Sequence, residues 1–213
     1  MKRTTKETTT ITCRASRDAV LDSLTIIEES ADRLADYAAV PIGFTVAEVF
    51  DENAIAALAG GESAAPTALA TPYWKDYDAY AGNGPTNWPA TFDTSRWTIL
   101  AGYRGTERVG GVIAIVADPK VDLLRDCSAC ALLWDLRVAP NVRGQGIGSA
   151  LLDAAESAVR RRGARALRVE TQQVNVPACR LYRRHGFHLE RVTRGAYADL
   201  PSEVQLLWLK LLT

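Results

Sequence analysis

The chain has 213 residues, of which 47% are hydrophobic and 23% charged, and its formal net charge at pH 7 is zero. This length is sufficient for one domain with a hydrophobic core, and the balanced charge excludes a global field that would attract nucleic acid or an anionic membrane. No apolar run approaches the roughly 20 residues that span a bilayer, and the N-terminus lacks the apolar region of a signal peptide. We therefore expect a cytoplasmic protein without a nucleic-acid or membrane partner.

The first fifty residues predict a polar extension followed by the start of the fold. Residues 1–22 are polar, rich in threonine and without periodicity, so we predict an N-terminal extension there and a single domain over 23–213. Within that domain we predict a strand at 23–30, a helix that ends at Pro41, and a strand of alternating polarity at 43–50.

Residues 51–95 have a different composition. They contain several prolines, glycine-rich turns and aromatic side chains, and positions 48–93 hold seven acidic residues but one basic residue, Lys75. Long irregular segments inside a compact domain are usually functional. We therefore predict that 51–95 is a long loop inserted in the domain for function.

The second half of the chain predicts regular strands and helices. Strands are expected at 96–103 and 109–118, joined as a hairpin, and at 131–138, 166–171, 187–193 and 203–210, with helices from Ile147 and over 177–185. This order, an antiparallel hairpin followed by β-α-β-α-β-β, predicts an α/β (α+β) fold with a mixed central sheet that is partly antiparallel and partly parallel.

Three glycines at alternate positions, Gly144, Gly146 and Gly148, precede the first of these helices. From Ile147 to Val159, apolar residues recur at helical spacing. The backbone N–H groups of a glycine-rich turn at a helix N-terminus typically bind a phosphate. A Walker A loop would need a lysine after Gly148, and a dinucleotide site would need the spacing G-x-G-x-x-G, which is absent. Coenzyme A is a third possible ligand of such a loop.

The pattern R-x-x-G-x-G from Arg143 to Gly148 resembles the acetyl-CoA-binding motif of the GCN5-related N-acetyltransferases (GNAT). A second block at 170–187, "ETQQVNVPACRLYRRHGF", is similar to that family's succession of a strand, an asparagine, an alanine three residues on, a tyrosine and a terminal "GF". The resemblance extends from Trp134 to Phe187. It implies the GNAT fold, in which a parallel pair of strands splays apart and helices cover both faces of the sheet.

The resemblance also implies that residues 131–187 form an acetyl-CoA-binding core, with acetyl-CoA as co-substrate and no metal. Independently, residues 137–194 contain 12 arginines and four acidic residues, a balance that suits a phosphate-bearing ligand. The implied cofactor-binding residues are Leu136, Arg137, Val138, Arg143, Gly144, Gln145, Gly146, Ile147, Gly148, Ser149, Asn175 and Ala178.

In this family the acceptor amine attacks the thioester directly, and the resemblance implies three catalytic candidates. Tyr182 would protonate the departing thiolate, the alternative being a tyrosine packed in the core. Glu170 would deprotonate the amine through water, the alternatives being a structural carboxylate there and Asp135 as the base. The backbone amide of Val138, beside a bulge that separates the strands, would stabilise the thioester oxygen, and Asn175 would cap the second helix.

Segments 71–80 and 87–97 resemble the acceptor region of the streptothricin acetyltransferases, which implies that 51–95 is an insertion on the acceptor side of the domain. Acidic and aromatic side chains there could neutralise and stack on a small cationic acceptor, such as a streptothricin-like antibiotic or a polyamine. The alternative is an aromatic-rich loop that packs on the sheet. The candidate acceptor-binding residues are Trp74, Asp76, Tyr77, Asp78, Tyr80 and Trp88, with Asp93 as a further source of negative charge.

Two other functions stay open from the sequence. A protein or peptide acetyltransferase, acting on N-termini or lysines, would bind its acceptor in an open groove. A non-catalytic acyl-CoA-binding module would lack turnover, although the presence of Tyr182 and Glu170 argues against it. We also consider the hypothesis that the protein forms a homodimer.

Cys127 and Cys130 form one C-x-x-C pair. No second pair lies at metal-ligand spacing, and the two histidines, His185 and His188, are far along the chain, so we predict no zinc site. A redox C-x-x-C normally opens a helix after a strand, whereas this pair precedes a predicted strand. We therefore expect the two cysteines to be reduced, in a loop.

Overall fold

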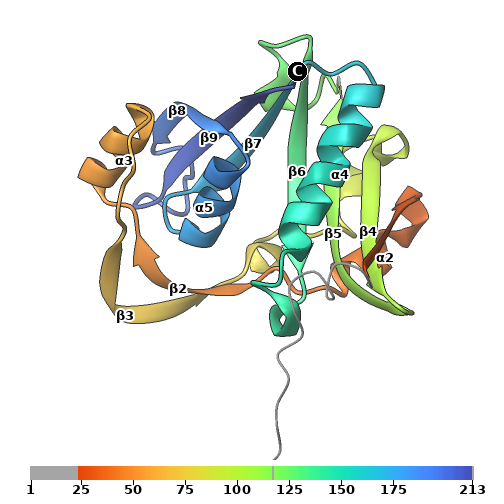
Figure 1. The fold of residues 1–213 in the computed structure, drawn as a ribbon, viewed down its shortest axis with the longest axis horizontal. Coiled ribbons are helices and arrows are strands. Elements are labelled where there is room, and N and C mark those ends of the chain that lie inside the picture. Colours follow the sequence, from red (N-terminus) through yellow and green to blue (C-terminus); the bar gives the residue numbers. More distant parts are fainter. Residues whose placement is uncertain (1–23, 117, 213) are drawn as a thin grey trace, which may run out of the picture.

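The structure, a computed structural model, describes residues 24–116 and 118–212 and centres on a seven-stranded sheet (Figure 1). The predicted extension, 1–22, lies outside these residues. The helices and strands are β1 (Leu24–Glu29), α2 (Leu34–Ala38), β2 (Phe44–Val49), α3 (Glu52–Ala59), β3 (Thr67–Lys75), β4 (Thr98–Arg104), β5 (Glu107–Val116), β6 (Cys130–Val138), α4 (Ile147–Arg161), β7 (Ala166–Gln172), α5 (Val176–Arg184), β8 (His188–Arg194) and β9 (Val204–Leu211).

The central sheet has the order β1-β4-β5-β6-β7-β9-β8, and β6 and β7 are its parallel pair. Their pairing ends where Leu133 lies opposite Val169, and the remainder of the two strands separates. β6 also carries a bulge, because Leu133 and Asp135 face consecutive residues of β5 while Trp134 faces none. A bulge bends its strand, and this one lies where the parallel pair separates. The predicted mixed sheet is confirmed.

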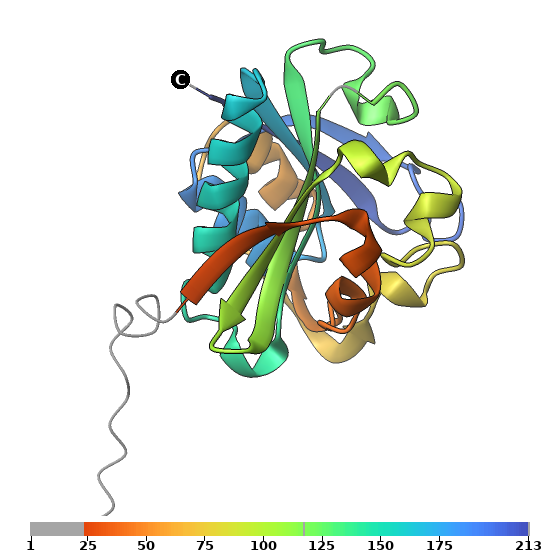
Figure 2. The same cartoon turned by 90° about the vertical axis from the view of Figure 1, so that its right-hand side faces the viewer.

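Helices cover both faces of the sheet, as predicted. Val112 and Ala114 of β5 belong to the core cluster under α3, α4 and α5, whereas Ile113 and Ile115 belong to the cluster under α2 and neighbouring loops. Figure 2 shows α4 on one side of the sheet and α2 on the other. This alternation follows from the period of two residues in a strand, which sends successive side chains to opposite faces.

α4 follows the glycine-rich stretch and confirms the helix predicted there. Gly146, at φ 91°, is its N-cap residue, and Gly144 has φ 77°, a region that residues with a side chain rarely adopt. The helix ends before Gly163, which again has positive φ. Its buried stripe consists of Ile147, Leu151, Leu152, Ala155, Glu156, Ala158 and Val159. No helix in the described ranges is long and apolar enough to cross a membrane.

The prediction that 51–95 is one long loop is wrong over its first half, which forms α3 and β3. Asp51 begins α3 by accepting a hydrogen bond from the Ala54 N–H at 2.9 Å. β3 pairs antiparallel with β2 in a separate two-stranded sheet, which runs along the lower edge of the molecule in Figure 1. Residues 76–97 then form short 3₁₀ turns. The prolines and glycines of the segment, which predict turns and loops, concealed these short elements from sequence reasoning, although Pro72 lies within β3 and Pro89 within a 3₁₀ turn.

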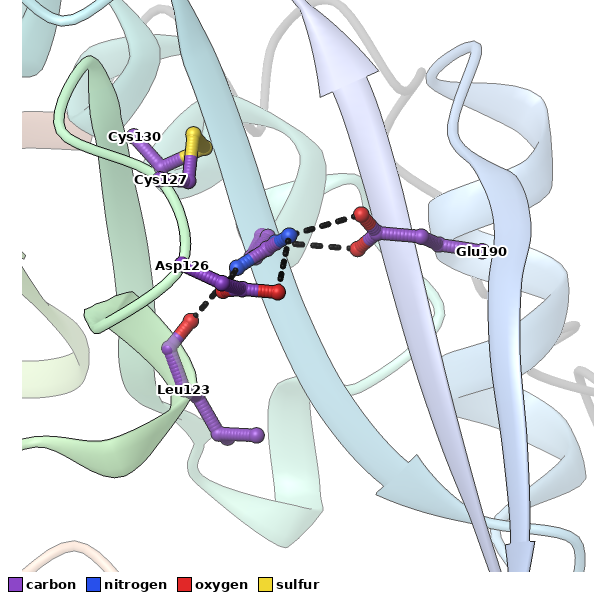
Figure 3. Close-up of a disulfide and its surroundings, with 6 residues drawn as sticks. Leu123, Asp126, Cys127, Cys130 and Glu190 are labelled. Atoms are coloured by element: carbon purple, nitrogen blue, oxygen red, sulfur yellow. Dashed lines mark hydrogen bonds and ion pairs between the residues drawn. A yellow bond between two sulfur atoms is a disulfide. The ribbon is translucent and has the colours of Figure 1, made fainter.

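The prediction that Cys127 and Cys130 are reduced is also wrong, because a disulfide joins them (Figure 3). The Cys130 N–H donates to the Cys127 carbonyl at 3.2 Å, and in this turn the two Cα atoms lie 5.4 Å apart, a separation that disulfides allow. Next to the disulfide, Asp126 accepts hydrogen bonds from Arg168 of β7, which also binds Glu190 of β8 (Figure 3). The loop that carries the cysteines is thereby tied to two strands of the sheet.

Candidate functional site

A cavity of about 840 Å³ opens where β6 and β7 separate. Its walls come from the loop before α4, the two splayed strands, α5 and the segment after β3. It is lined by the three catalytic candidates and by every predicted cofactor-binding residue except Gln145. Of the predicted acceptor residues, the cavity includes Tyr77, Asp78 and Trp88 and leaves out Trp74, Asp76 and Tyr80.

The glycine-rich loop supplies one end of this cavity with hydrogen-bond donors. The six consecutive N–H groups from Gly144 to Ser149 pair with no acceptor among the residues that the structure describes. They lie at the N-terminus of α4, where the helix dipole also favours an anion. Gly148, in the first turn, keeps the cavity wall free of a side chain. This arrangement fits the pyrophosphate of coenzyme A.

Two polar side chains of the loop contact protein groups. The Arg143 guanidinium donates to the carbonyl oxygens of Val138, Gly43 and Pro41 at 2.8, 2.9 and 3.0 Å. Gln145 accepts a hydrogen bond from Arg104 at 2.9 Å. Arg143 therefore fastens the loop to the segment between α2 and β2, and the six backbone N–H groups remain free donors at this end of the cavity.

Arg137 and Asp135, on β6, belong to a buried network of charges. The Arg137 guanidinium, with 0% of its side chain exposed, donates to Asp135 at 2.9 and 2.7 Å and to Asp78 at 2.9 and 3.2 Å. Tyr37 of α2 also donates to Asp135, at 2.6 Å. Burial would lower the pKa of Arg137, but the two carboxylates raise it above its ordinary value. Asp135, Arg137 and Asp78 therefore mainly compensate one another's charges.

Glu170, the other candidate base, lies at the end of β7 in a different environment. Its Oε1 accepts hydrogen bonds from the Tyr197 hydroxyl and, at 3.0 Å, from Gln172 Nε2. Burial raises the pKa of Glu170 above its ordinary value, and these two donors oppose that rise. No cation pairs with it among the described residues. A carboxylate with a raised pKa and without an ion pair is well suited to accept a proton near neutral pH.

A chain of hydrogen bonds connects Glu170 to the N-terminus of α5. Asn175 caps that helix by accepting from the Ala178 N–H at 3.2 Å, as predicted, and its Nδ2 donates to the Tyr77 hydroxyl at 3.3 Å. Tyr77 in turn donates to Gln172, which donates to Glu170. The cofactor side of the cavity and the candidate base are thus joined through shared side chains.

Tyr182, on α5, is 5% exposed and lines the cavity. Its ring packs at 5.7 Å from that of Phe187, so it also serves the hydrophobic core. Burial raises the pKa of Tyr182, and its hydroxyl bonds to no described residue. The phenol therefore keeps its proton and has it available for a ligand.

The other acceptor candidates have structural contacts. Trp88 is 8% exposed and packs with Tyr37, Trp97 and Trp134. Trp74 is 62% exposed on β3, outside the cavity. Asp76 and Asp93 each cap a 3₁₀ turn, and Tyr80 lines a smaller neighbouring cavity. The three predicted sources of negative charge, Asp76, Asp78 and Asp93, are thus all engaged by the protein.

Sequence reasoning missed two residues that contact the candidate base, Gln172 and Tyr197. Gln172 follows Glu170 by two residues on β7, so strand periodicity could have placed both on one face. Tyr197 lies in the connection between β8 and β9, in no motif, and carried no detectable signal. A buried pair of Lys75 and Glu203, 2.6 Å apart, was likewise not foreseen.

One cluster of possible metal ligands lies outside the cavity, where Asp153, Glu156 and His185 approach within 4.8 Å of one another. Glu156 is already paired with Lys210 at 2.6 Å and with Arg160 at 3.6 Å. These ion pairs account for the buried carboxylate without a metal.

A helix N-terminus with free backbone N–H groups thus lies beside a splayed parallel strand pair. The sequence pattern of the acetyltransferase (GNAT) family matches residues 62–187, more than half of the chain. The chain therefore belongs to this family, which confirms the resemblance inferred from its two motifs.

Within the family, the chain is similar to streptothricin acetyltransferase A of Bacillus subtilis (strain 168), with 30% identity over 91 residues that cover 42% of this chain and 53% of that protein. It is 42% identical to the streptothricin acetyltransferase of Streptomyces lavendulae over 69 residues, which cover 32% of this chain and 36% of that protein. The chain thus spans about half the length, or less, of these curated relatives.

Two solved structures share the fold over nearly the whole chain. A nourseothricin acetyltransferase superimposes with a TM-score of 0.68 at 22% identity, covering 90% of this chain and 99% of that one. A structure described as a streptothricin acetyltransferase from Bacillus anthracis str. Ames, in complex with acetyl coenzyme A, gives 0.65 at 18% identity, covering 89% and 99%. At these identities the likeness establishes the fold.

Proposed function

We propose that this protein is an N-acetyltransferase that transfers an acetyl group from acetyl-CoA to a primary amine of a small cationic acceptor. One observation carries the proposal: a single cavity joins the six free N–H groups at α4 to the buried carboxyl of Glu170 and the phenol of Tyr182. Acetyl-CoA, when bound, supplies an activated thioester. The names of the curated relatives support a streptothricin-like antibiotic as acceptor. A polyamine is the alternative small cationic acceptor.

The chain's own residues can perform the proton transfers that direct attack requires. A primary amine is mostly protonated to ammonium at neutral pH. A base must therefore take a proton from it before the amine can attack. Glu170 is the base that the geometry favours over Asp135, since Arg137 already pairs with Asp135. Tyr182 holds a proton for the sulfur that leaves. The predicted contact of the Val138 amide with the thioester oxygen, the cytoplasmic location and the homodimer stay predictions.

The acceptor is tested by a screen with acetyl-CoA that follows the release of free thiol. We expect turnover with streptothricin or a polyamine and none with lysine-containing peptides. Turnover with peptides alone would favour the alternative, a protein acetyltransferase. Binding of acetyl-CoA without thiol release from any amine would favour a non-catalytic acyl-CoA-binding module.

The role of Tyr182 is tested in the same assay. We expect the substitution Tyr182→Phe to lower kcat by about 10²-fold or more, because a general acid contributes that much, while acetyl-CoA still binds. Unchanged turnover in this variant would overturn the role of Tyr182 as proton donor.

A further inference from the structure

The hydrogen bonds between the N-terminus of α5 and Glu170 have a fixed direction. The Ala178 N–H, which can only donate, bonds to Asn175 Oδ1 at 3.2 Å, so the donor end of that amide, Nδ2, faces the Tyr77 hydroxyl at 3.3 Å. The phenol oxygen thus accepts from Asn175, and its one proton is donated to Oε1 of Gln172. The other end of the Gln172 amide, Nε2, is therefore turned toward Glu170.

One oxygen of the Glu170 carboxyl receives both of its donors. Gln172 Nε2 donates to Glu170 Oε1 at 3.0 Å and to the Tyr197 hydroxyl at 2.9 Å, and Tyr197 in turn donates to the same Oε1. Oε2 has no donor among the described residues. A reversed Gln172 amide would present its oxygen to the carboxylate, and two acceptors have no proton to share. The orientation of this one amide therefore decides whether Gln172 stabilises the ionised base.

The protein holds Tyr77 from several sides. Its ring lies 5.8 Å from that of Phe44 on β2 and 5.3 Å from the ammonium of the buried Lys75. The side chain of Asn83 donates to the Tyr77 carbonyl at 3.2 Å, and Asp76 caps the 3₁₀ turn that contains Tyr77. Because these contacts fix its conformation, the Tyr77 hydroxyl can orient a neighbouring side chain.

We infer that Tyr77 is a positioning residue, which keeps Nε2 of Gln172 turned toward Glu170 and leaves Glu170 Oε2 to take the proton of the amine. The sequence predicted that Tyr77 binds the acceptor, whereas this inference assigns its hydroxyl to the base. It rests on the proposed function and deepens it, because it names the residue that acts on Glu170 through a second side chain.

The titratable groups around Glu170 come from four parts of the chain. They are Tyr77 after β3, Tyr182 on α5, Tyr197 after β8 and Glu203 before β9. Burial raises the pKa of each tyrosine, so the three phenols stay neutral in the acidic range. Glu203 pairs with Lys75 at 2.6 Å, and Asp135 and Arg137 of β6, which also line the large cavity, pair with each other.

The test is a double-substitution cycle, read from the pH profile of kcat/KM for the amine that the acceptor screen identifies. Tyr77→Phe keeps the ring and removes the hydroxyl. We expect the acidic limb to move to higher pH, with a rate loss of about threefold to tenfold on that limb, the effect of one hydrogen bond, and with converging rates at alkaline pH. In a Gln172→Met protein, Tyr77→Phe should add no further shift, because the hydroxyl acts through the amide.

Tyr103→Phe is the matched control. The Tyr103 hydroxyl donates to a carboxylate, that of Glu29, at 2.8 Å, and both residues lie outside the two cavities. We expect this substitution to leave the acidic limb in place. A uniform rate loss in Tyr77→Phe with an unmoved limb, or the same added shift in the Gln172→Met protein, would overturn the positioning role while acetylation itself stands.

A direct titration of the carboxyl separates this role from the proposed function. Carbon-13 NMR of the glutamate carboxyl groups needs no turnover, and the Glu170 signal is the one absent from Glu170→Gln. We expect Glu170 to titrate at higher pH in Tyr77→Phe than in the unchanged protein and in Tyr103→Phe. An unmoved titration would refute the role of Tyr77. Absence of thiol release from every amine would instead refute the proposed function, whatever the titration shows.

Discussion

Glu170 is the residue on which the proposed chemistry depends most, and its surroundings set its basicity. Burial raises the pKa of Glu170, and the nearby charge of Glu203 acts in the same direction. The hydrogen bonds from Tyr197 and Gln172 stabilise the ionised carboxylate and oppose both effects. The buried hydroxyls of Tyr77 and Tyr182 lie nearby and stay protonated. Activity should therefore fall with decreasing pH as Glu170 becomes protonated.

The substitution Tyr197→Phe tests this balance. Loss of the donor raises the pKa of Glu170 further, so a smaller fraction is ionised at a given pH. We expect the acidic limb of the pH profile of kcat/KM to move to higher pH, with rates converging toward those of the unchanged protein at alkaline pH. Tyr73→Phe, on the exposed edge of β3, is the matched control. A uniform rate loss with an unmoved limb would mean that Tyr197 does not act through Glu170.

At this scale, sequence reasoning placed Tyr182, Glu170 and Asn175 in one cavity, because the spacing of a motif keeps residues of consecutive elements together. It could not place Tyr197, which reaches the same carboxyl from another connection of the sheet. Nor could it foresee that Asp78 would pair with Arg137, since their contact depends on how the segment after β3 folds against β6.

Among the elements, β6 holds the site together through Arg137. This guanidinium bonds to Asp135 on its own strand, to Asp78 in the segment after β3, and to the Val40 carbonyl after α2, at 3.2 Å. Three parts of the chain that are distant in sequence thus meet at one buried charge. Breaking such a pair is costly because it leaves the partner's charge buried and uncompensated.

We expect Arg137→Met to lower the free energy of unfolding by about 3–5 kcal/mol, the range for removal of one partner of a buried ion pair. Arg125→Met is the matched control, because Arg125 pairs with Asp122 on the surface, where such a pair contributes at most about 1 kcal/mol. Urea denaturation measures the free energy of unfolding of each variant. Equal stability of the variants would contradict a central role of the network.

The regular elements of the second half were predictable because their polarity follows a period of 2 or 3.6 residues over long runs, as from Ile147 to Val159. α3 and β3 were not. α3 has eight residues, six of them alanine, isoleucine or leucine, and β3 lies in a two-stranded ribbon with little buried surface. Neither element has the contrast between a polar face and an apolar face on which such predictions depend.

For the molecule as a whole, the disulfide between Cys127 and Cys130 is a covalent link next to a sheet whose seven strands are already joined by hydrogen bonds. Because it closes a very short loop, it restricts the unfolded chain little, and we expect Cys127→Ser with Cys130→Ser to cost at most about 2 kcal/mol of unfolding free energy. Urea denaturation without reductant measures this cost. Thiol titration of the denatured protein should find two fewer thiols before reduction than after, and equal counts would contradict the disulfide.

The most direct test of the central claim is mass spectrometry of the products formed from acetyl-CoA and a diamine or streptothricin. The account predicts that the amine gains one acetyl group for each free CoA thiol released, and that Glu170→Gln slows this reaction by about 10²-fold or more. Thiol release without an acetylated amine, or no reaction with any amine although acetyl-CoA binds, would contradict it.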